Sequence, residues 1–158
     1  MTRRTSAGRP SPASHFPAIP FEHQPELRAL MMFPTLPPGH MTFPVPDDAF
    51  YPHLRRGEFA VVDLADHQPA EGELFLISYR DQRIESGHVY ALCAMHLKRS
   101  RVDPARTSWY ARHSLPEAGV GVALLEGPFT TEHAAEKLVG RVVGVWVPGA
   151  AARGASAS

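Results

Sequence analysis

The stretch GEFAVVDLADHQPAEGELFLISYR, residues 57–80, contains the same short pattern twice. Each copy begins with glycine and glutamate in a turn and continues into an apolar run of strand length, at residues 59–63 and 73–80. Glycine allows the positive φ angles that tight turns use, and β-branched and aromatic residues favour the pleated surface of a sheet. The stretch therefore predicts two strands, each launched by a turn.

Similar segments recur along the rest of the chain. Valine and aromatic residues dominate them, and a single helical turn is predicted within residues 128–137, with Thr130 or Thr131 as its N-cap. Strands spaced about 10 to 15 residues apart predict a mostly β fold, a curled sheet or partly closed barrel. The further predicted strands are residues 88–97, 107–114, 120–126 and 137–148.

The two ends of the chain differ in composition from its middle. They are rich in small residues and, at the N-terminus, in proline, without a period that could bury one face, so we predict a disordered arm and a disordered tail. A short helix is predicted at residues 25–33, with Pro25 in its first turn and Pro34 beyond its end. The predicted organisation is an arm at residues 1–24, a helix or linker at 25–40, a folded domain at 41–148 and a tail at 149–158.

Length and composition exclude several classes of protein. The 158 residues suffice for one compact domain, and 16 basic and 16 acidic residues give a formal net charge of zero, so nucleic-acid binding would require a local patch. The single cysteine, Cys93, cannot form an internal disulfide and is expected in the core. No apolar run approaches the roughly 18 residues that cross a bilayer, and no apolar segment follows Arg3 and Arg4 as in a signal peptide. We expect a cytoplasmic protein without a membrane segment or a cofactor.

A second stretch, DDAFYPHLRRGEFAVVD at residues 47–63, has the layout of a loop that carries a reactive group. Pro52 restricts φ at a bend, Gly57 can adopt a positive φ, and the following strand holds the bend against the core. A side chain at position 49 would lie on a loop fixed by rigid elements, where reactive groups are often found. The residue there is Ala49, and a methyl group cannot act as a nucleophile.

Together these features resemble the LexA-like peptidases (the S24 family), which include self-cleaving repressors and a mutagenesis protein of the DNA-damage response and are related to signal peptidases. The family pattern is Gly-Asp-Ser-Met-x-Pro, then Gly-Asp, an apolar strand ending in Val-Asp, then Pro-x-x-Gly-Asp and a second apolar strand. The terminal run KLVGRVVGVWVP is also similar to the family's last strand, so the resemblance spans about residues 41–148. The matching residues are 47–52, 57–58, 59–63 and 69–73.

The resemblance implies a Ser-Lys dyad, in which a neutral lysine takes the proton of the attacking serine. Ala49 occupies the serine position, and Lys98, followed by Arg99, is the candidate remnant of the lysine base. The alternative for Lys98 is a solvated basic cluster with Arg99 and Arg101, and an exposed Lys98 is what an inactive descendant should have. We therefore expect an inactive domain that binds a peptide or protein partner. Its cleft and turn residues would be Asp48, Phe50, Pro52 and Gly57.

An active peptidase with another nucleophile is an alternative function. Ser78 and Ser86 are the nearby serines, although neither has the family's sequence context. Self-cleaving relatives cut an Ala-Gly or Cys-Gly bond in an N-terminal arm, and this arm contains Ala7-Gly8, a dipeptide that also arises readily by chance in such a sequence.

A nucleic-acid-binding β domain is a third function left open. Lys98 to Arg101 could contact phosphates, and aromatic residues near Trp109 and Tyr110 could stack on bases. Alternation along a strand places Trp109 and Tyr110 on opposite faces, so at least one is expected in the core. The arm is too short and too rich in proline for a helix-turn-helix. A peptide or protein is thus favoured over nucleic acid, and the resemblance adds a homodimer as a possible assembly.

The nine histidines raise the question of a metal site. They are scattered, without a cysteine pair or His-x-x-x-His spacing, so we expect no metal. The residues considered are His40, His53, His67, His88, His96, His113 and His133.

Overall fold

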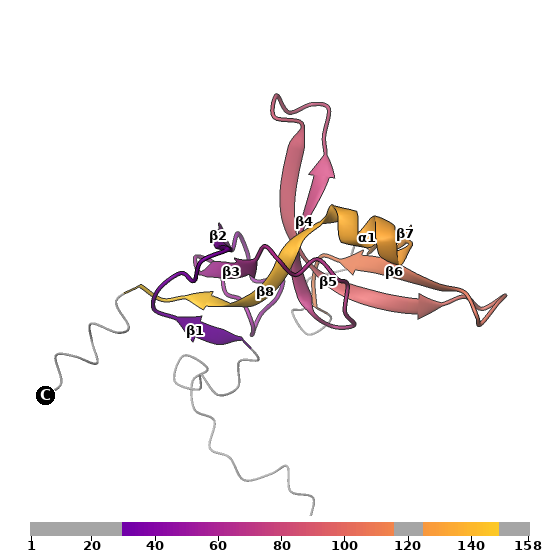
Figure 1. Ribbon diagram of the computed structural model, residues 1–158, viewed down its shortest axis with the longest axis horizontal. Helices are drawn as coiled ribbons and strands as arrows, with labels where there is room; N and C mark the ends of the chain where they lie inside the picture. Colours follow the sequence, from indigo (N-terminus) through magenta and orange to yellow (C-terminus); the bar gives the residue numbers. More distant parts are fainter. Residues whose placement is uncertain (1–29, 116–124, 149–158) are drawn as a thin grey trace, which may run out of the picture.

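The structure is a computed structural model that describes residues 30–115 and 125–148 of the chain. The predicted arm and tail lie outside these ranges. Within them the chain is mostly β, as predicted, with one short helix (Figure 1). The elements are β1 (Met31–Phe33), β2 (His40–Pro44), β3 (Phe59–Asp63), β4 (Leu74–Arg80), β5 (His88–Arg99), β6 (Thr107–Arg112), β7 (Leu125–Phe129), α1 (Thr131–Lys137) and β8 (Leu138–Trp146).

All eight strands belong to one sheet. Seven follow the order β2-β3-β8-β4-β5-β6-β7 in antiparallel pairs, and β1 pairs with β8 in parallel. The end strands β2 and β7 are not paired with each other in the described ranges, so the sheet is open and the predicted curled sheet or partly closed barrel is wrong.

The long strand β5 explains why the sheet does not close. Its residues 88–94 pair with β4, whereas its residues 94–99 pair with β6. The two hairpins that share β5 therefore point in different directions, one upward and one to the right in Figure 1. Strands that diverge in this way cannot bring the two edges of the sheet together.

The strand β1 replaces the end of the predicted helix. Residues 31–33 pair with residues 144–146 of β8, so the helix is wrong there, and residues 25–29 lie outside the described part. Gly144 makes the pairing possible, because a Cβ atom at this position would collide with the ring of Phe33 and the carbonyl of Met31. A helix this short depends on tertiary contacts, and here those contacts favour a strand.

Strand β4 lies at the centre of the core and is buried on both faces. Its Leu76 belongs to one apolar cluster, and Phe75 and Ile77 belong to another. The loop between β2 and β3 contributes Leu54 to the first cluster, and α1 contributes Ala134 to the second. The loop that carries position 49 is therefore part of the core.

The core position of Cys93, the expectation that at least one of Trp109 and Tyr110 is in the core, and one predicted cap are confirmed. Cys93 is fully buried and Trp109 is 9 % exposed, both in the second cluster. Burial, with the charge of Glu126 nearby, raises the pKa of the Cys93 thiol well above its usual range. Thr130 is the N-cap of α1, and its hydroxyl accepts a 3.1 Å hydrogen bond from the N–H of His133.

Candidate functional site

The segment between β2 and β3 forms a closed and well-anchored loop. At its base, the N–H of Val45 donates to the carbonyl of Glu58 (2.8 Å) and the N–H of Gly57 donates to the carbonyl of Val45 (3.0 Å). Gly57 has a φ of 85°, which confirms the positive φ predicted for this turn. Phe50 and Leu54 are 3 % and 0 % exposed and anchor the loop in the core. Position 49 is thus held on a rigid support.

The two aspartates of this loop satisfy backbone groups. Asp47 Oδ1 accepts from the N–H of Ala49, and Asp48 Oδ1 accepts from the N–H of Arg56, both at 3.0 Å. Pro52 lies in the turn that follows and is half-buried. Both aspartates are exposed and act as turn residues.

Ala49 itself is buried against β5. It is 8 % exposed and shares its apolar cluster with Leu92 and Ala94. Its carbonyl accepts a 2.8 Å hydrogen bond from the N–H of Leu115, just after β6. Leu92 and Ala94 are therefore the β5 residues of this cluster, and neither carries an amine.

The structure does not bring Lys98 to Ala49. The chain has two lysines, Lys98 and Lys137. Lys98 is exposed, with Nζ 5.1 Å from the centre of the Tyr110 ring, and it is six residues beyond Leu92 on one strand, about 20 Å in an extended chain. Lys137 Nζ lies 5.4 Å from the centres of two other aromatic rings, in the second core region. Both lysines thus lie against aromatic rings, and Lys98 is exposed on the hairpin of β5 and β6.

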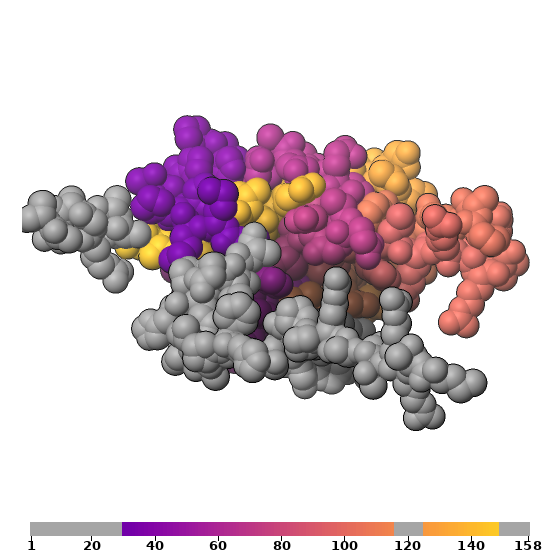
Figure 2. All heavy atoms as spheres, turned by 90° about the horizontal axis from the view of Figure 1, so that it is seen from below, coloured from indigo at the N-terminus to yellow at the C-terminus, as the bar shows by residue number. Residues whose placement is uncertain are grey.

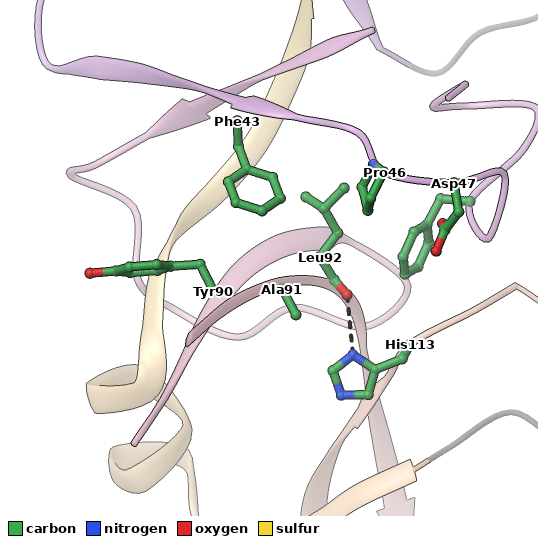
Figure 3. A pocket seen from close by; sticks show the side chains of 8 residues that line it. Phe43, Pro46, Asp47, Tyr90, Ala91, Leu92 and His113 are labelled. Carbon is green, nitrogen blue, oxygen red and sulfur yellow. Dashed lines mark hydrogen bonds between the residues drawn. The ribbon is translucent and has the colours of Figure 1, made fainter. Parts of the chain in front are cut away.

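A small apolar hollow lies beside the loop (Figure 3). Its volume is about 210 Å³, below the roughly 300–1,000 Å³ of typical small-molecule sites, so it suits one or two side chains. In Figure 3 the side chain of Leu92 points up between Phe43 and Pro46, and Asp47 and His113 supply polar groups. The lining residues are Phe43, Pro46, Asp47, Phe50, Tyr90, Ala91, Leu92 and His113.

The backbone of β5 has alternating hydrogen-bonding directions. The N–H of Met95 donates toward β4, to the carbonyl of Glu73, at 3.0 Å. The N–H of Ser100 donates in the other direction, to the carbonyl of Arg106 at the end of the hairpin with β6, at 2.8 Å. In an antiparallel ladder the N–H and C=O of one residue point to the same side, and successive residues alternate. Even-numbered residues of β5 therefore direct their backbone groups away from β4.

Among the described residues, this alternation leaves part of the β5 edge without a partner strand next to the hollow. Strand β6 pairs with β5 only from Ala94 onward, so no strand in the described ranges covers Tyr90 and Leu92 on this side. The carbonyl of Leu92 is contacted by the ring of His113 (Nδ1 to O, 3.2 Å), drawn as the dashed line in Figure 3. Open N–H and C=O groups of a strand can pair with another extended chain. No local sequence pattern indicates this edge, because it depends on where β6 ends.

His113 belongs to a polar network behind the hollow. Its Nδ1 donates to a carbonyl, so its Nε2 accepts the 2.8 Å hydrogen bond from the Tyr79 hydroxyl when the ring is neutral, and Glu126 Oε1 lies 3.5 Å from Nε2. Burial, with the charge of Glu126 nearby, raises the pKa of Tyr79 above its usual range, so the hydroxyl remains a donor. The network holds the His113 ring against the carbonyl of Leu92.

The serines offer one hydrogen-bonded Ser–His pair on the hairpin of β4 and β5. Ser78 Oγ lies 3.3 Å from His88 Nδ1 at an exposed position, and Ser86 Oγ donates to the carbonyl of His88. No carboxylate in the described ranges is bonded to His88 to orient it. Ser114, after β6, is 7 % exposed and follows the His113 of the hollow. A peptidase without Ser at position 49 would have to use one of the other serines, and among the described residues Ser78 is the one bonded to a histidine ring.

The described residues show no metal centre and no spanning helix. Within residues 30–115 and 125–148, no three His, Cys, Asp or Glu side chains are grouped closely enough to hold a metal ion. No helix in the same ranges has the length and apolar character needed to cross a membrane. No family model matches the chain, no curated protein matches its sequence, and no solved structure matches its fold.

Proposed function

We propose that this chain is a LexA-like peptidase-fold domain without catalytic activity, which binds an extended peptide or protein segment by adding it as a strand to the open edge of β5. The observation that carries the proposal is the outer edge of β5 at Tyr90 and Leu92, which pairs with no strand of the described ranges and lies beside an apolar hollow. Strand addition uses main-chain hydrogen bonds for affinity and pockets for alternate side chains for specificity. It therefore needs no serine.

The residues around the edge indicate which peptides would bind. Phe43, Phe50 and Leu92 make most of the hollow apolar, so a peptide with a medium-sized apolar side chain is expected there. Neighbouring peptide side chains would point to the opposite face of the sheet, because side chains alternate along a strand. Asp47 at one side favours a basic residue close to that apolar one.

Loss of catalysis is supported by the two positions that a dyad requires. A methyl group stands at position 49, and both lysines pack against aromatic rings outside the Ala49 cluster. In a serine protease, loss of the nucleophile lowers the rate about a millionfold. Peptide binding can outlast such a loss, whereas useful proteolysis cannot.

A pair of substitutions at one position tests the proposal. Tyr90→Pro removes the N–H that an added strand would use, and Tyr90→Ala removes the half-exposed ring but keeps that N–H. A labelled peptide with the sequence of residues 1–20, the chain's own arm, is titrated against the full chain by fluorescence anisotropy. Tyr90→Ala should bind within a few-fold of the wild type and Tyr90→Pro at least about 10-fold more weakly, the loss of one or more hydrogen bonds.

Amide exchange gives the second measurement. Peptide binding should slow exchange at the N–H of Tyr90 and Leu92 and leave the buried ladder between β4 and β5 unchanged. Absence of both saturable binding and new protection at these two amides would refute the strand-addition proposal. Equal binding by Tyr90→Pro and the wild type would do the same.

A further inference from the structure

The hairpin of β5 and β6 carries a concentration of basic residues that the peptide edge does not use. We call residues 97–108 the basic arm. It has four cations and one acid, a net charge of +3, within a chain whose formal net charge is zero. Figures 1 and 2 show the basic arm projecting from the rest of the domain, at the right of both views. Its exposed cations are Lys98, Arg99, Arg101 and Arg106.

The second projecting hairpin, of β4 and β5, provides an internal comparison. Its charged residues, Arg80, Asp81, Arg83 and Glu85, sum to zero, and Arg83 Nε lies 3.2 Å from Asp81 Oδ1. In contrast, no carboxylate of the described residues forms an ion pair with any of the four cations of the basic arm. An exposed hairpin of this sheet thus forms without excess positive charge. The fold therefore does not require the positive charge of the basic arm.

The end of the basic arm is ordered by hydrogen bonds within its turn. Ser100 Oγ accepts from the N–H groups of Val102 (3.2 Å) and Asp103 (3.3 Å). Asp103 Oδ1 accepts from the N–H of Ala105 at 3.1 Å, so the one acid of the arm is engaged in its own turn. Val102 is 96 % exposed at the tip. The arm is therefore a preorganised ribbon that ends in an exposed apolar side chain.

A shallow polar hollow of about 830 Å³ runs along the arm. It combines the four cations with the hydroxyls of serine and threonine residues, and Lys98 lies over the ring of Tyr110. Guanidinium, ammonium and hydroxyl groups are the common donors to phosphate oxygens. The hydroxyl residues of its lining are Ser100, Thr107, Ser108 and Thr130.

We infer that the basic arm binds duplex DNA by inserting its two strands into the major groove. Two paired strands lie about 5 Å apart, and with side chains such a ribbon matches the roughly 12 Å width of the groove. The projection of the arm keeps the rest of the domain clear of the flanking phosphates. Arginine also donates in pairs to phosphate and guanine, which suits both walls and floor of the groove. The zero net charge of the chain does not oppose this binding, because the excess charge is local.

Matched double substitutions on the two hairpins test the inference. Arg99→Ala with Arg101→Ala removes two cations from the basic arm, and Arg80→Ala with Arg83→Ala removes two from the other hairpin. The full chain is titrated into a labelled duplex of about 20 base pairs, two turns of B-DNA, at several salt concentrations. The first pair should lower affinity about 50-fold near 0.1 M salt and reduce the slope of log K against log salt by about two. The second pair should change neither quantity measurably.

Competing polyanions decide whether duplex DNA is the partner. The unlabelled duplex should displace the labelled one, and the same strand without its complement should compete at least about 10-fold less well, because it has no groove. Equal competition by single strands or by vesicles of anionic phospholipid would overturn the duplex-groove inference. It would also be overturned if the two double substitutions weakened binding equally, or if the wild type did not bind. Circular dichroism confirms that both variants are folded.

Discussion

Ala49 and Leu92 belong to the same buried apolar cluster, whereas both lysines of the chain lie elsewhere against aromatic rings. A serine at position 49 would consequently be buried among apolar side chains, while Lys98 lies six residues beyond Leu92 on β5. The rigid loop around it nevertheless persists, because its anchors contribute to the core and its aspartates bond to its own backbone. The loop thus keeps its structure in this chain without a nucleophile at position 49.

The first prediction concerns Ala49→Ser, which should not produce self-cleavage. The new hydroxyl would be buried without a base, and we expect a loss of about 1 kcal/mol of unfolding free energy. Intact mass after prolonged incubation measures cleavage, and urea unfolding measures stability. Ala65→Ser, at an exposed alanine after β3, is the matched control and should be neutral in both.

An unrecognised nucleophile would give a different pattern in the same measurement. Cleavage of the wild-type chain that is lost in Ser78→Ala and retained in Ser86→Ala would assign the reaction to the serine bonded to His88. That result would contradict the inactive-domain proposal. A stable intact mass in all three proteins is the expected outcome.

The second prediction tests the anchor of the loop. Leu54 is fully buried, so Leu54→Ala should cost about 2–5 kcal/mol, the usual loss for a buried leucine with a residual cavity. Leu64→Ala removes the same atoms from a side chain that is 39 % exposed and should cost about 0.5 kcal/mol. Urea unfolding of both variants gives the comparison, and equal losses would show that Leu54 does not anchor the loop.

Local sequence patterns predicted much of the fold because most strands pair with chain neighbours. The apolar runs at residues 59–63 and 73–80 became β3 and β4 almost without change, and the threonine cap of α1 was recognisable from its residue type. The strand β1 was not predictable, because only its partner β8, near the other end of the chain, stabilises three residues as a strand. The divergence of the two hairpins follows from the pairing of β5, which local patterns do not encode.

Some residues of the candidate site were likewise predictable from local sequence, and others were not. The turn residues Gly57, Asp47 and Asp48 were predictable, since their roles depend on local geometry. Leu92 and His113 are placed at the site by the register of β5 and by the position where β6 ends. Their neighbours in the sequence therefore do not predict this role. The resemblance suggested Lys98 because it lies near the strand where the family has its lysine and is followed by Arg99, but on β5 Lys98 lies six residues beyond Leu92.

The third prediction concerns the parallel pairing of β1 with β8. Gly144→Ala would place a Cβ atom against the ring of Phe33 and the backbone of Met31, so β1 should detach from the sheet. We expect faster amide exchange at Val147, whose N–H donates to the carbonyl of Phe33, and a stability loss of about 1–3 kcal/mol. Gly57→Ala meets no atom within 4 Å and strains only the local backbone, so it should leave exchange at Val147 unchanged.

The last prediction is a pH dependence at the base of the basic arm. Glu71 accepts hydrogen bonds from the N–H of Leu97 and from His96 Nδ1 (2.7 Å). Partial burial acts to raise the pKa of Glu71, but these two hydrogen bonds, together with electrostatic attraction from His96 and Arg112, outweigh it and hold the pKa below its usual value. A carboxyl with a depressed pKa in the folded state stabilises the fold above its unfolded pKa of about 4.3, and this contribution disappears as pH falls through the folded value.

Glu71→Gln should therefore destabilise the chain at pH 7, by less than about 1 kcal/mol because the side chain is half-exposed, and should have no effect near pH 2. Glu73→Gln, at an exposed glutamate two residues away, is the control and should show no such difference between the two pH values in urea unfolding.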